Sequence, residues 1–542
     1  MSFVATMFES VAAAGDKALL IEVRGKELVP TSAAETRELT ARVRGFMAAA
    51  GVQPGDRVAL LAPNSARWVA VDLAILGEGA IGVPLYSRQE PRELAGMLRD
   101  CAPVLLVVSD ETLEGSIRAA WPDACRIARF EEVFAAEPTE AAPFAAPEDH
   151  PVTIIYTSGT SGEPKGVVYH RRNVDYMLPT TASRIHELTG QRGTDDKVFH
   201  FLPFCFAGSR IMLWTQLYRG NPILLSTDLT QLVQEIPTAD PHYYLNVPAV
   251  LERIRTGVGK KLQEMGGVGL TLYTNGWDAW QRVRAGQGGL SDKVMLGLAK
   301  RFVFTKIKDT VGRSLEFLIC GSAPLSPETQ SWFEMIGIPV FQVYGLTETT
   351  AIVTMDRPGG VVAGRVGHAI PGCEAKITDE GELICRGPNI FAGYWKKPEA
   401  TADAIRDGWF HTGDQAELDD KGNWKIVGRL KNLIKPESGH WVAPEQLEQR
   451  LIDTGVGIEQ AMVVGHARPF LAALVAGSVE QGAIDRAVEL VNKDLPHYRR
   501  IRKAVKTPEA FTIENGLLTA NQKMRRKVIE QRFQAEIEGL YR

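Results

Sequence analysis

The chain carries its most evident chemistry between Tyr156 and Gly166, where it reads YTSGTSGEPKG directly after the apolar residues 152–155. Glycines let the backbone approach a ligand closely, and successive backbone N–H groups in such a loop form an anion site. Lys165 adds a positive charge, and hydroxyl groups add further donors. The loop residues between strand and lysine are Thr157, Ser158, Gly159, Thr160, Ser161 and Gly162. We therefore predict a polyphosphate site, although the spacing is not the Walker pattern.

Two other strings contain residue types that suit a nucleotide. Gly321–Ser326 follows the apolar run 315–320, and its simplest interpretation is a strand-to-helix turn with Ser326 as the helix N-cap. In Val343–Thr350 an aromatic residue precedes Gly, Thr and Glu, which offers a flat face for a base and an acid near phosphates. Glu348 beside a triphosphate could hold Mg²⁺, because this ion takes one or two carboxylates and keeps most of its waters.

Two ionisable side chains further along have both a structural and a functional interpretation. Asp414 ends the string WFHTGD, which predicts a tight turn, and it is either an Asx-turn residue or a carboxylate for both ribose hydroxyls. Lys523 stands in a basic run with Arg525, Arg526 and Lys527. From the residues alone, a solvated basic surface is the simpler interpretation of that run.

Length and composition bound the class of protein. A chain of 542 residues exceeds one hydrophobic core, so two or more domains are expected. The net charge of −4 gives no reason to propose nucleic acid or a strongly anionic membrane as a partner. Six scattered cysteines without a C-x-x-C pair indicate reduced thiols in a cytosolic protein. The N-terminus lacks a secretory signal, and no apolar stretch is long enough to span a bilayer.

The order of periodic segments predicts parallel sheets with crossover helices. We expect helices over 31–50 and 64–76 and strands over 57–61 and 81–85. Residues 134–150 are rich in Ala, Pro and Glu and are expected to form a surface linker.

The second half of the chain shows different sequence patterns from the first. Residues 257–292 hold many glycines without clear periodicity, so we expect an insertion or a long loop there. Residues 374–386 and 414–427 each read as a β-hairpin around a central turn, which predicts a small β-rich subdomain. A compact mixed α/β unit follows Arg429.

Taken together, these strings resemble the adenylate-forming superfamily of acyl-CoA synthetases, luciferases and peptide-synthetase adenylation domains. They occur in its order and rough spacing from about residue 30 to residue 530. The resemblance implies an α/β fold: a large N-terminal domain of parallel-type sheets with flanking helices plus a small β-rich subdomain, and a small mobile α+β C-terminal domain. The implied boundaries are 1–428 for the ATP- and acyl-binding domain, with the subdomain at about 365–428, and 429–542 for the lid.

The resemblance also implies a role for each matching residue. Thr157–Gly162 and Lys165 would hold the ATP phosphates, Thr347 would lie near the α-phosphate, and Glu348 would hold Mg²⁺. Lys523 would be the catalytic lysine and Lys431 the hinge. The residues implied to enclose the adenine or bind the ribose are Gly321, Ser322, Ala323, Tyr344, Gly345, Asp414 and Arg429.

Within the superfamily the chain looks most similar to the long-chain fatty acyl-CoA synthetases, on the strings 201–210, 247–254, 298–310 and 438–445. It departs from them at Phe206, where those enzymes usually carry His, and at Ser209, where they carry an acid. We expect Phe206 and Trp214 to line an apolar acyl pocket. Ala520-Asn521 replaces the usual Pro-Thr before the catalytic lysine.

The implied activity is ATP-dependent conversion of a carboxylic acid, expected to be a fatty acid, into acyl-AMP and then into a coenzyme A thioester. ATP, Mg²⁺ and coenzyme A are the expected cofactor and substrates. An acyl-AMP ligase that loads a carrier protein and an inactive adenylate-binding sensor remain alternatives. We expect a cytoplasmic protein. Contact with the inner face of the membrane, the preferred acyl chain length and the oligomeric state are left open.

Overall fold

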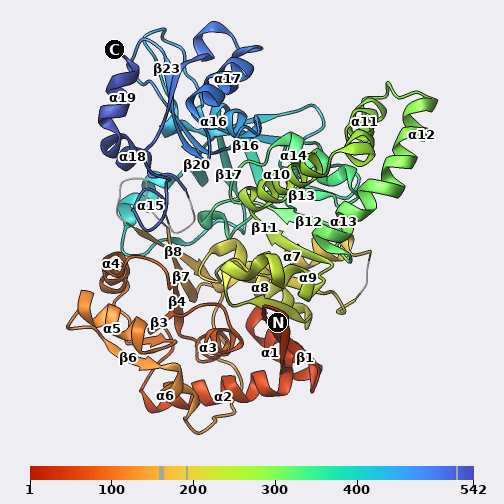
Figure 1. Ribbon diagram of the computed structural model, residues 1–542. Helices are drawn as coiled ribbons and strands as arrows, with labels where there is room; N and C mark the ends of the chain where they lie inside the picture. The colour runs from red at the N-terminus through yellow and green to blue at the C-terminus, as the bar shows by residue number, and fades with distance from the viewer. Residues whose placement is uncertain (158–163, 191–192, 520–522) are drawn as a thin grey trace. The chain divides into compact units, whose positions relative to one another are not determined.

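The computed structural model describes residues 1–157, 164–190, 193–519 and 523–542. The predictions for Ser158, Gly159, Thr160, Ser161 and Gly162, and the Ala520-Asn521 pair, lie outside these residues. Internal contacts divide the chain into two compact units (Figure 1). Unit 1 comprises residues 1–87, 91–374 and 386–405, and unit 2 comprises 88–90, 375–385 and 406–542.

A mostly parallel nine-stranded sheet forms one layer of unit 1. Its strands, in spatial order, are β15 (His368–Ala369), β14 (Thr354–Met355), β13 (Val340–Tyr344), β12 (Leu318–Cys320), β11 (Tyr243–Asn246), β9 (Val198–His200), β10 (Ile223–Ser226), β1 (Ala18–Arg24) and β2 (Glu27–Ser32). Side chains alternate between two cores: Tyr244 and Leu318 pack on one face, and Tyr243 and Phe317 on the other. Helices must therefore cover both faces, as expected for a parallel sheet.

A seven-stranded sheet forms the second layer of unit 1. Its strands, in spatial order, are β18 (Gly393–Tyr394), β8 (Lys165–His170), β7 (Pro151–Thr157), β4 (Ile81–Leu85), β3 (Arg57–Leu61), β5 (Leu105–Val108) and β6 (Arg126–Arg129). The strands β7, β4, β3, β5 and β6 run parallel, whereas β8 and β18 add an antiparallel edge. Lys165 and Tyr394, two residues of the candidate site, lie on this edge.

The predicted strands 57–61 and 81–85 are confirmed with the same bounds, and the predicted helices 31–50 and 64–76 are confirmed with ends that differ by one or two residues. The helices of this region are α1 (Phe3–Ala14), α2 (Ala33–Ala49), α3 (Ala66–Gly77), α4 (Pro91–Cys101), α5 (Glu111–Ala120) and α6 (Phe130–Phe134). Helix α2 begins where Ser32 and Glu35 form a reciprocal capping box. Residues 136–149 form no helix or strand, as expected for the linker.

Unit 2 holds two smaller sheets. The β-rich one contains β16 (Glu374–Ile377), β17 (Glu382–Arg386), β20 (Trp409–Leu418), β19 (Ile405–Arg406) and β21 (Trp424–Arg429). The other contains β22 (Ile458–Val464), β23 (Leu471–Gly477) and β24 (Ile501–Lys506), with helices α16 (Pro444–Asp453), α17 (Gln481–Asn492), α18 (Arg526–Arg532) and α19 (Gln534–Leu540). Both predicted hairpins are present. The predicted α/β class is confirmed.

The prediction of a long loop over 257–292 is wrong, because most of this region is helical. It lies within α10 (Pro248–Met265), α11 (Gly267–Arg284) and the start of α12 (Leu290–Ala299), and a short π-helical stretch, Lys300–Phe304, leads into α13 (Thr305–Gly312). Figure 1 shows α11 and α12 side by side. Gly276 shows why a glycine in this region does not mark a loop. A Cβ there would lie 2.5 Å from Ala299 Cβ and 2.8 Å from Phe304 Cζ. This glycine serves close helix packing and not a turn.

Gly276→Ala should therefore destabilise unit 1 by about 1–3 kcal/mol through overpacking. Gly257→Ala on α10 is the matched control, because nothing lies within 4 Å of its added Cβ, and it should stabilise by about 0.5–1 kcal/mol through helix propensity. Melting temperatures of the two variants, followed by circular dichroism, measure the contrast. Equal shifts in both variants would contradict the close packing of α11 against α12.

Candidate functional site

The predicted phosphate segment spans an antiparallel hairpin in unit 1. Thr157 ends β7 and Lys165 begins β8, and the two residues are paired across the ladder. The apolar strand before the loop is thus confirmed, with Ile154 and Ile155 buried. Lys165 Nζ lies 5.0 Å from the centre of the Tyr394 ring, which is within cation–π range. The backbone geometry therefore places one cation at the mouth of the hairpin.

The predicted adenine residues follow neighbouring parallel strands. β12 pairs with β13, and Cys320 faces Gln342, so Gly321–Ala323 follow β12 at the same edge of the sheet where Tyr344 ends β13. Ser322 has a φ of +74°, and both Ser322 and Ala323 are exposed. Ser326 caps α14 (Pro327–Met335) by accepting from the Thr329 N–H, as predicted. The carboxyl edge of a parallel sheet is where such folds bind ligands.

A tight turn after β13 presents Thr347 and Glu348. These residues form a single 3₁₀ turn, Thr347–Thr349. A Cβ on Gly345 would lie 2.1 Å from the Ala351 carbonyl oxygen, so only glycine fits where the chain folds back. The Thr347 carbonyl accepts a 2.6 Å hydrogen bond from the hydroxyl of Tyr169 on β8. Burial, with help from Glu348, raises the pKa of Tyr169 well above its usual value, so this hydroxyl stays a donor.

Tyr394 connects the phosphate hairpin to this turn. Its hydroxyl donates a 2.8 Å hydrogen bond to Glu348 Oε1, and its ring lies beneath Lys165. Backbone bonds hold the segment on both sides: β18 pairs with β8, and the Phe391 N–H donates to the Glu348 carbonyl at 2.9 Å. Asn389 adds a further tie, since its amide donates to the Ile352 carbonyl. One short segment thus aligns a cation and a carboxylate that are 183 positions apart in the chain.

Tyr394 is not among the site residues predicted from the sequence. A signal is present in the string Phe391-Ala-Gly-Tyr-Trp395, where aromatic residues flank a glycine without helical periodicity. Gly393 has a φ of +143°, and a Cβ there would lie 3.0 Å from Thr401. Such a glycine between aromatic residues indicates close backbone packing at a strand edge.

Asp414 and Arg429 form an ion pair in unit 2. They face each other across β20 and β21, and Arg429 Nε lies 2.7 Å from Asp414 Oδ1. The tight turn expected at Asp414 is wrong: the residue lies inside β20, where Gly413 with a φ of +69° interrupts the extended chain. Asp414 is buried while Arg429 is half-buried. The pair can orient a carboxylate toward hydroxyl groups.

The two predicted lysines of unit 2 lie in exposed positions. Lys431 is the middle residue of a 3₁₀ turn, Leu430–Asn432, directly after β21. Lys523 is exposed, and its carbonyl accepts a 2.8 Å hydrogen bond from the Thr519 N–H, next to the pairing of Leu518 with Met524.

The basic run around Lys523 is not uniformly solvated. Arg526 donates to buried Glu448 at 2.6 Å, and Glu448 also accepts from the Val463 N–H. Arg526 therefore has a structural role, whereas the Lys523 side chain is exposed.

The two predicted acyl-pocket residues have different surroundings. Phe206 is half-buried at the start of α8 (Ala207–Arg219), with its ring 5.6 Å from that of Tyr86. Trp214 is fully buried, and its Nε1–H donates to Asp72 at 2.7 Å. Asp72 also pairs with buried Arg210. Trp214 thus has the contacts of a core side chain, and its place in a pocket stays a prediction.

A metal ion would depend on few protein ligands here. In the part of the chain that the structure describes, no cluster of three or more His, Cys, Asp or Glu side chains could hold one. Glu348 is half-buried and oriented by Tyr394. This arrangement fits Mg²⁺, which binds through one carboxylate together with phosphate oxygens and water.

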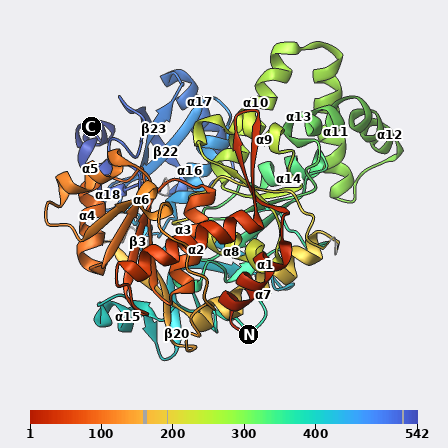
Figure 2. The same ribbon diagram turned by 90° about the horizontal axis from the view of Figure 1, so that it is seen from below.

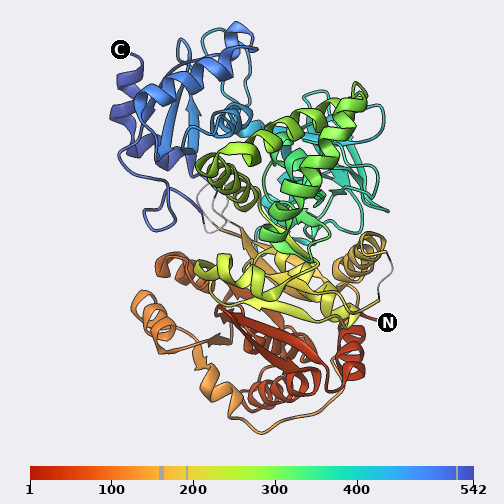
Figure 3. The same ribbon diagram turned by 45° about the vertical axis from the view of Figure 1, so that its right-hand side comes forward.

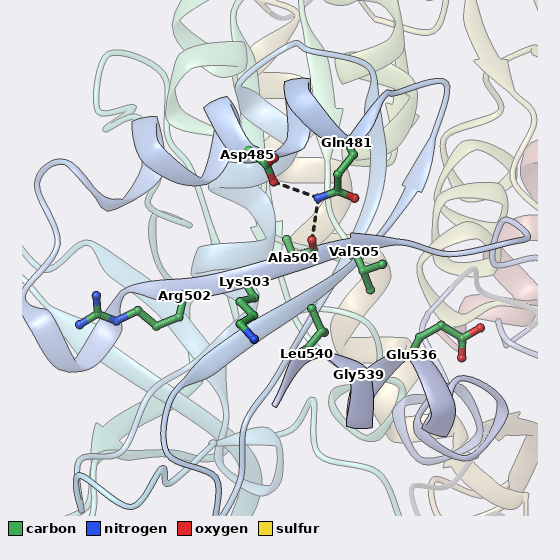
Figure 4. Close-up of a pocket in the computed structure, with 9 residues that line it drawn as sticks. All are labelled: Gln481, Asp485, Arg502, Lys503, Ala504, Val505, Glu536, Gly539 and Leu540. Carbon is green, nitrogen blue, oxygen red and sulfur yellow. Dashed lines mark hydrogen bonds between the residues drawn. The ribbon is translucent and has the colours of Figure 1, made fainter. Parts of the chain in front are cut away.

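A separate shallow cavity of about 490 Å³ lies in unit 2 (Figure 4). Arg502, Lys503 and Glu536 are among its lining residues, and Gln481 is held there by bonds to Asp485 and the Ala504 carbonyl. None of the predicted site residues lines it. We assign it no role in the chemistry.

A buried acid supports the strand that leads to Tyr344. Asp356 Oδ2 accepts from the Gln342 N–H at 2.7 Å, while its other oxygen is buried without a hydrogen bond. Burial raises the pKa of Asp356 to about 7, against opposing effects of the Gln342 N–H and of Arg184. The folded protein thus keeps a proton that an ordinary Asp releases near pH 3.8.

This difference in protonation stabilises the folded state fully below about pH 4, and the stabilisation is lost as the pH rises through 7. Between these pH values the folded state keeps a proton that the unfolded state has released. Asp356→Asn should remove this loss and exceed the parent by about 2–4 kcal/mol at pH 8. The advantage should shrink at pH 5. Thermal melts across this range measure it, with exposed Asp149→Asn as control. A pH-independent difference would contradict the assignment.

Comparisons with known proteins identify the family of this chain. A family model described as AMP-binding enzyme matches residues 7–395, and one described as AMP-binding enzyme C-terminal domain matches residues 431–542. The long-chain-fatty-acid–CoA ligase FadD15 of Mycobacterium bovis is 29% identical over 94% of this chain and 92% of its own. The putative fatty-acid–CoA ligase fadD11 of Mycobacterium tuberculosis is 30% identical over 73% of this chain and 74% of its own.

A solved structure shares the fold. The A domain of carboxylic acid reductase from Segniliparus rugosus, in complex with AMP and a co-purified carboxylic acid, superposes with a TM-score of 0.80. The alignment covers 100% of this chain and 94% of that one at 21% identity. The predicted resemblance is therefore confirmed, and the chain belongs to the AMP-binding enzyme family.

Proposed function

We propose that this enzyme uses Mg²⁺-ATP to convert a fatty acid into acyl-AMP and then into its coenzyme A thioester. The observation that carries the proposal is the alignment of Lys165, Tyr394 and Glu348 at the phosphate hairpin. A cation for phosphate oxygens and a carboxylate for Mg²⁺ then flank one place. The names of the relatives FadD15 and fadD11 support fatty acids as the substrate class.

The chemistry explains why both charges are required. A carboxylate is a poor acyl donor, so its oxygen attacks the ATP α-phosphorus, the bond to the β-phosphate oxygen breaks, and pyrophosphate leaves. Bound Mg²⁺ would offset part of the crowded negative charge. Lys165 would offset charge on the departing phosphates and Lys523 charge at the α-phosphate. In the second step the coenzyme A sulfur attacks the acyl carbon and AMP leaves.

The remaining predicted residues would position the nucleotide. Gly321, Ser322, Ala323 and Tyr344, with Gly345 allowing the fold-back, would enclose the adenine. Thr347 would lie near the α-phosphate, and Thr157 would contribute to the phosphate loop. Asp414, oriented by Arg429, would accept from both ribose hydroxyls. Phe206 and Trp214 stay proposed members of an apolar acyl pocket.

We propose domain boundaries at 1–428 and 429–542, with Lys431 as the hinge. The exposed 3₁₀ turn at Lys431 supports a hinge, because element ends absorb backbone rotation with little cost. The second family model also begins at residue 431. Rotation there would deliver Lys523 for adenylation and withdraw it for thioester formation.

We also propose that the enzyme acts in the cytoplasm, at the inner face of the membrane. Cys101, Cys125, Cys205 and Cys320 are free thiols, which suits a reducing compartment. Among the described helices, none is long and apolar enough to cross a bilayer.

Pyrophosphate exchange over a panel of carboxylic acids tests the function. We expect exchange with fatty acids and Mg²⁺-ATP. Lys523→Ala should reduce it by about 10²-fold or more, because a cation is lost where transition-state charge develops. Lys527→Ala, an exposed neighbour in the same basic run, should leave it unchanged.

Supplied acyl-AMP separates the two half-reactions. Lys523→Ala should still form acyl-CoA from it at near the parental rate. No exchange with any acid would refute the function, and transfer to a holo carrier protein but not to free coenzyme A would support the alternative acceptor.

Tyr394→Phe should slow acyl-AMP formation by about tenfold or more, because a hydrogen bond to a charged group is lost, and should raise the Mg²⁺ concentration needed for half-maximal rate. Tyr394→Leu should be slower still, since Lys165 also loses the ring. Tyr541→Phe, which removes a hydroxyl bonded to the Phe470 carbonyl in unit 2, is the control. Parental Mg²⁺ dependence in Tyr394→Phe would exclude its orienting role.

A further inference from the structure

The helical segment that follows β11 differs in charge from the rest of the protein. Residues 248–313 contain 12 Lys and Arg and 5 Asp and Glu, a net charge of +7, while the whole chain carries −4. The remaining residues therefore carry −11. Figures 1 and 2 show α11, α12 and α13 grouped together within unit 1, and they form the green helices of Figure 3. Residues 248–313 are thus the part of unit 1 in which cations exceed acids by seven.

An exposed apolar row follows one side of α12 and the π-helical stretch after it. Leu290, Val294, Leu298 and Phe302 are spaced by four residues, and their exposed fractions are 81%, 58%, 43% and 49%. Residues four apart share a helix face, so the four side chains form a continuous strip, here called the α12 strip. Large apolar side chains aligned in this way on a surface indicate an interaction site.

The α12 strip lies outside the core, because the same helices pack against the core through their opposite side. Ala299, Val303, Phe304 and Ile307 are buried in the cluster that covers the nine-stranded sheet. Packing of Gly276 against Ala299 and Phe304 fixes which side faces inward. The helices are therefore anchored through one face and leave the other free for a partner.

Cations border the α12 strip. Lys293, Lys300 and Arg301 are exposed, and no ion pair is recorded for them among the residues that the structure describes. Arg282 already engages Asp292, the nearest acid in the chain to Lys293. Arg301 also lies over the Phe302 ring, 5.8 Å from its centre. Apolar side chains between uncompensated cations are the pattern of helices that lie in a membrane interface.

We propose that the α12 strip docks on the surface of an anionic lipid bilayer, with the apolar side chains among the acyl chains and the cations at the headgroups. Charge complementarity selects this occupant. A second copy would bring together two segments that each carry a net charge of +7. Nucleic acid would match the cations but not four exposed aliphatic and aromatic side chains. If the proposed function holds, docking places the enzyme at the phase into which fatty acids partition.

Vesicle flotation without ATP or fatty acid tests the proposal independently of catalysis. Wild-type protein should float with phosphatidylcholine vesicles that contain about one-third phosphatidylglycerol, and much less with pure phosphatidylcholine. Raising the salt from about 0.1 M to 0.5 M should weaken binding, because shorter screening reduces attraction to the headgroups.

Matched variants separate the two contributions. Leu290→Ser/Val294→Ser should weaken binding at least tenfold through lost apolar contact. Lys293→Gln/Lys300→Gln should weaken it about 25-fold, at about fivefold per cation. Leu490→Ser/Lys493→Gln, at the C-terminal end of α17, removes the same residue types from another exposed surface and should bind as wild type.

Three results would overturn the proposal: no preference for anionic vesicles, equal losses in the α17 control, or a concentration-dependent dimer that the strip variants abolish. The last would assign the face to a second copy. All three variants should keep pyrophosphate exchange with a water-soluble short-chain acid. Vesicle binding without exchange would refute the proposed function and support the docking surface.

Discussion

The site of this enzyme depends on bringing a lysine and a glutamate together from two different sheets. Lys165 begins a strand of the seven-stranded sheet, and Glu348 follows a strand of the nine-stranded sheet. The short strand β18 and the Phe391 N–H make backbone bonds to both. Tyr394 then contacts both side chains directly. This segment therefore fixes the position of the Lys165 cation relative to the Glu348 carboxylate, as the proposed binding of phosphates requires.

The surrounding structure supplies rigidity where the ligand groups meet. The turn at Gly345 is close-packed against the Ala351 backbone, and the Thr347 carbonyl is tied to Tyr169. Such buried ties lower the cost of reorganisation when charge develops in the transition state. Unit 2 differs, since the Lys523 side chain is exposed to solvent. This exposure is compatible with the proposed delivery of Lys523 by rotation at Lys431.

Charge is distributed unevenly over the molecule. The average charge of −4 suggested no anionic partner, yet residues 248–313 carry +7. An average conceals this segment because the rest of the chain is acidic. The same segment was expected to be a loop on account of its glycines. These helices pack closely at Gly276 on one face and leave the α12 strip exposed on the other.

The sequence by itself determined the family, the α/β class and the local elements around the motifs, because capping residues, strand periodicity and glycine positions act between near neighbours. Ser326 and the strand before Thr157 are examples. Only the tertiary structure decided which residues meet across long separations. It paired Arg526 with Glu448, placed Trp214 against Asp72, and put Tyr394 between Lys165 and Glu348. It also kept Asp414 in a strand, because pairing of β20 with β21 outweighed the local turn preference. Such contacts depend on partners that no local pattern records.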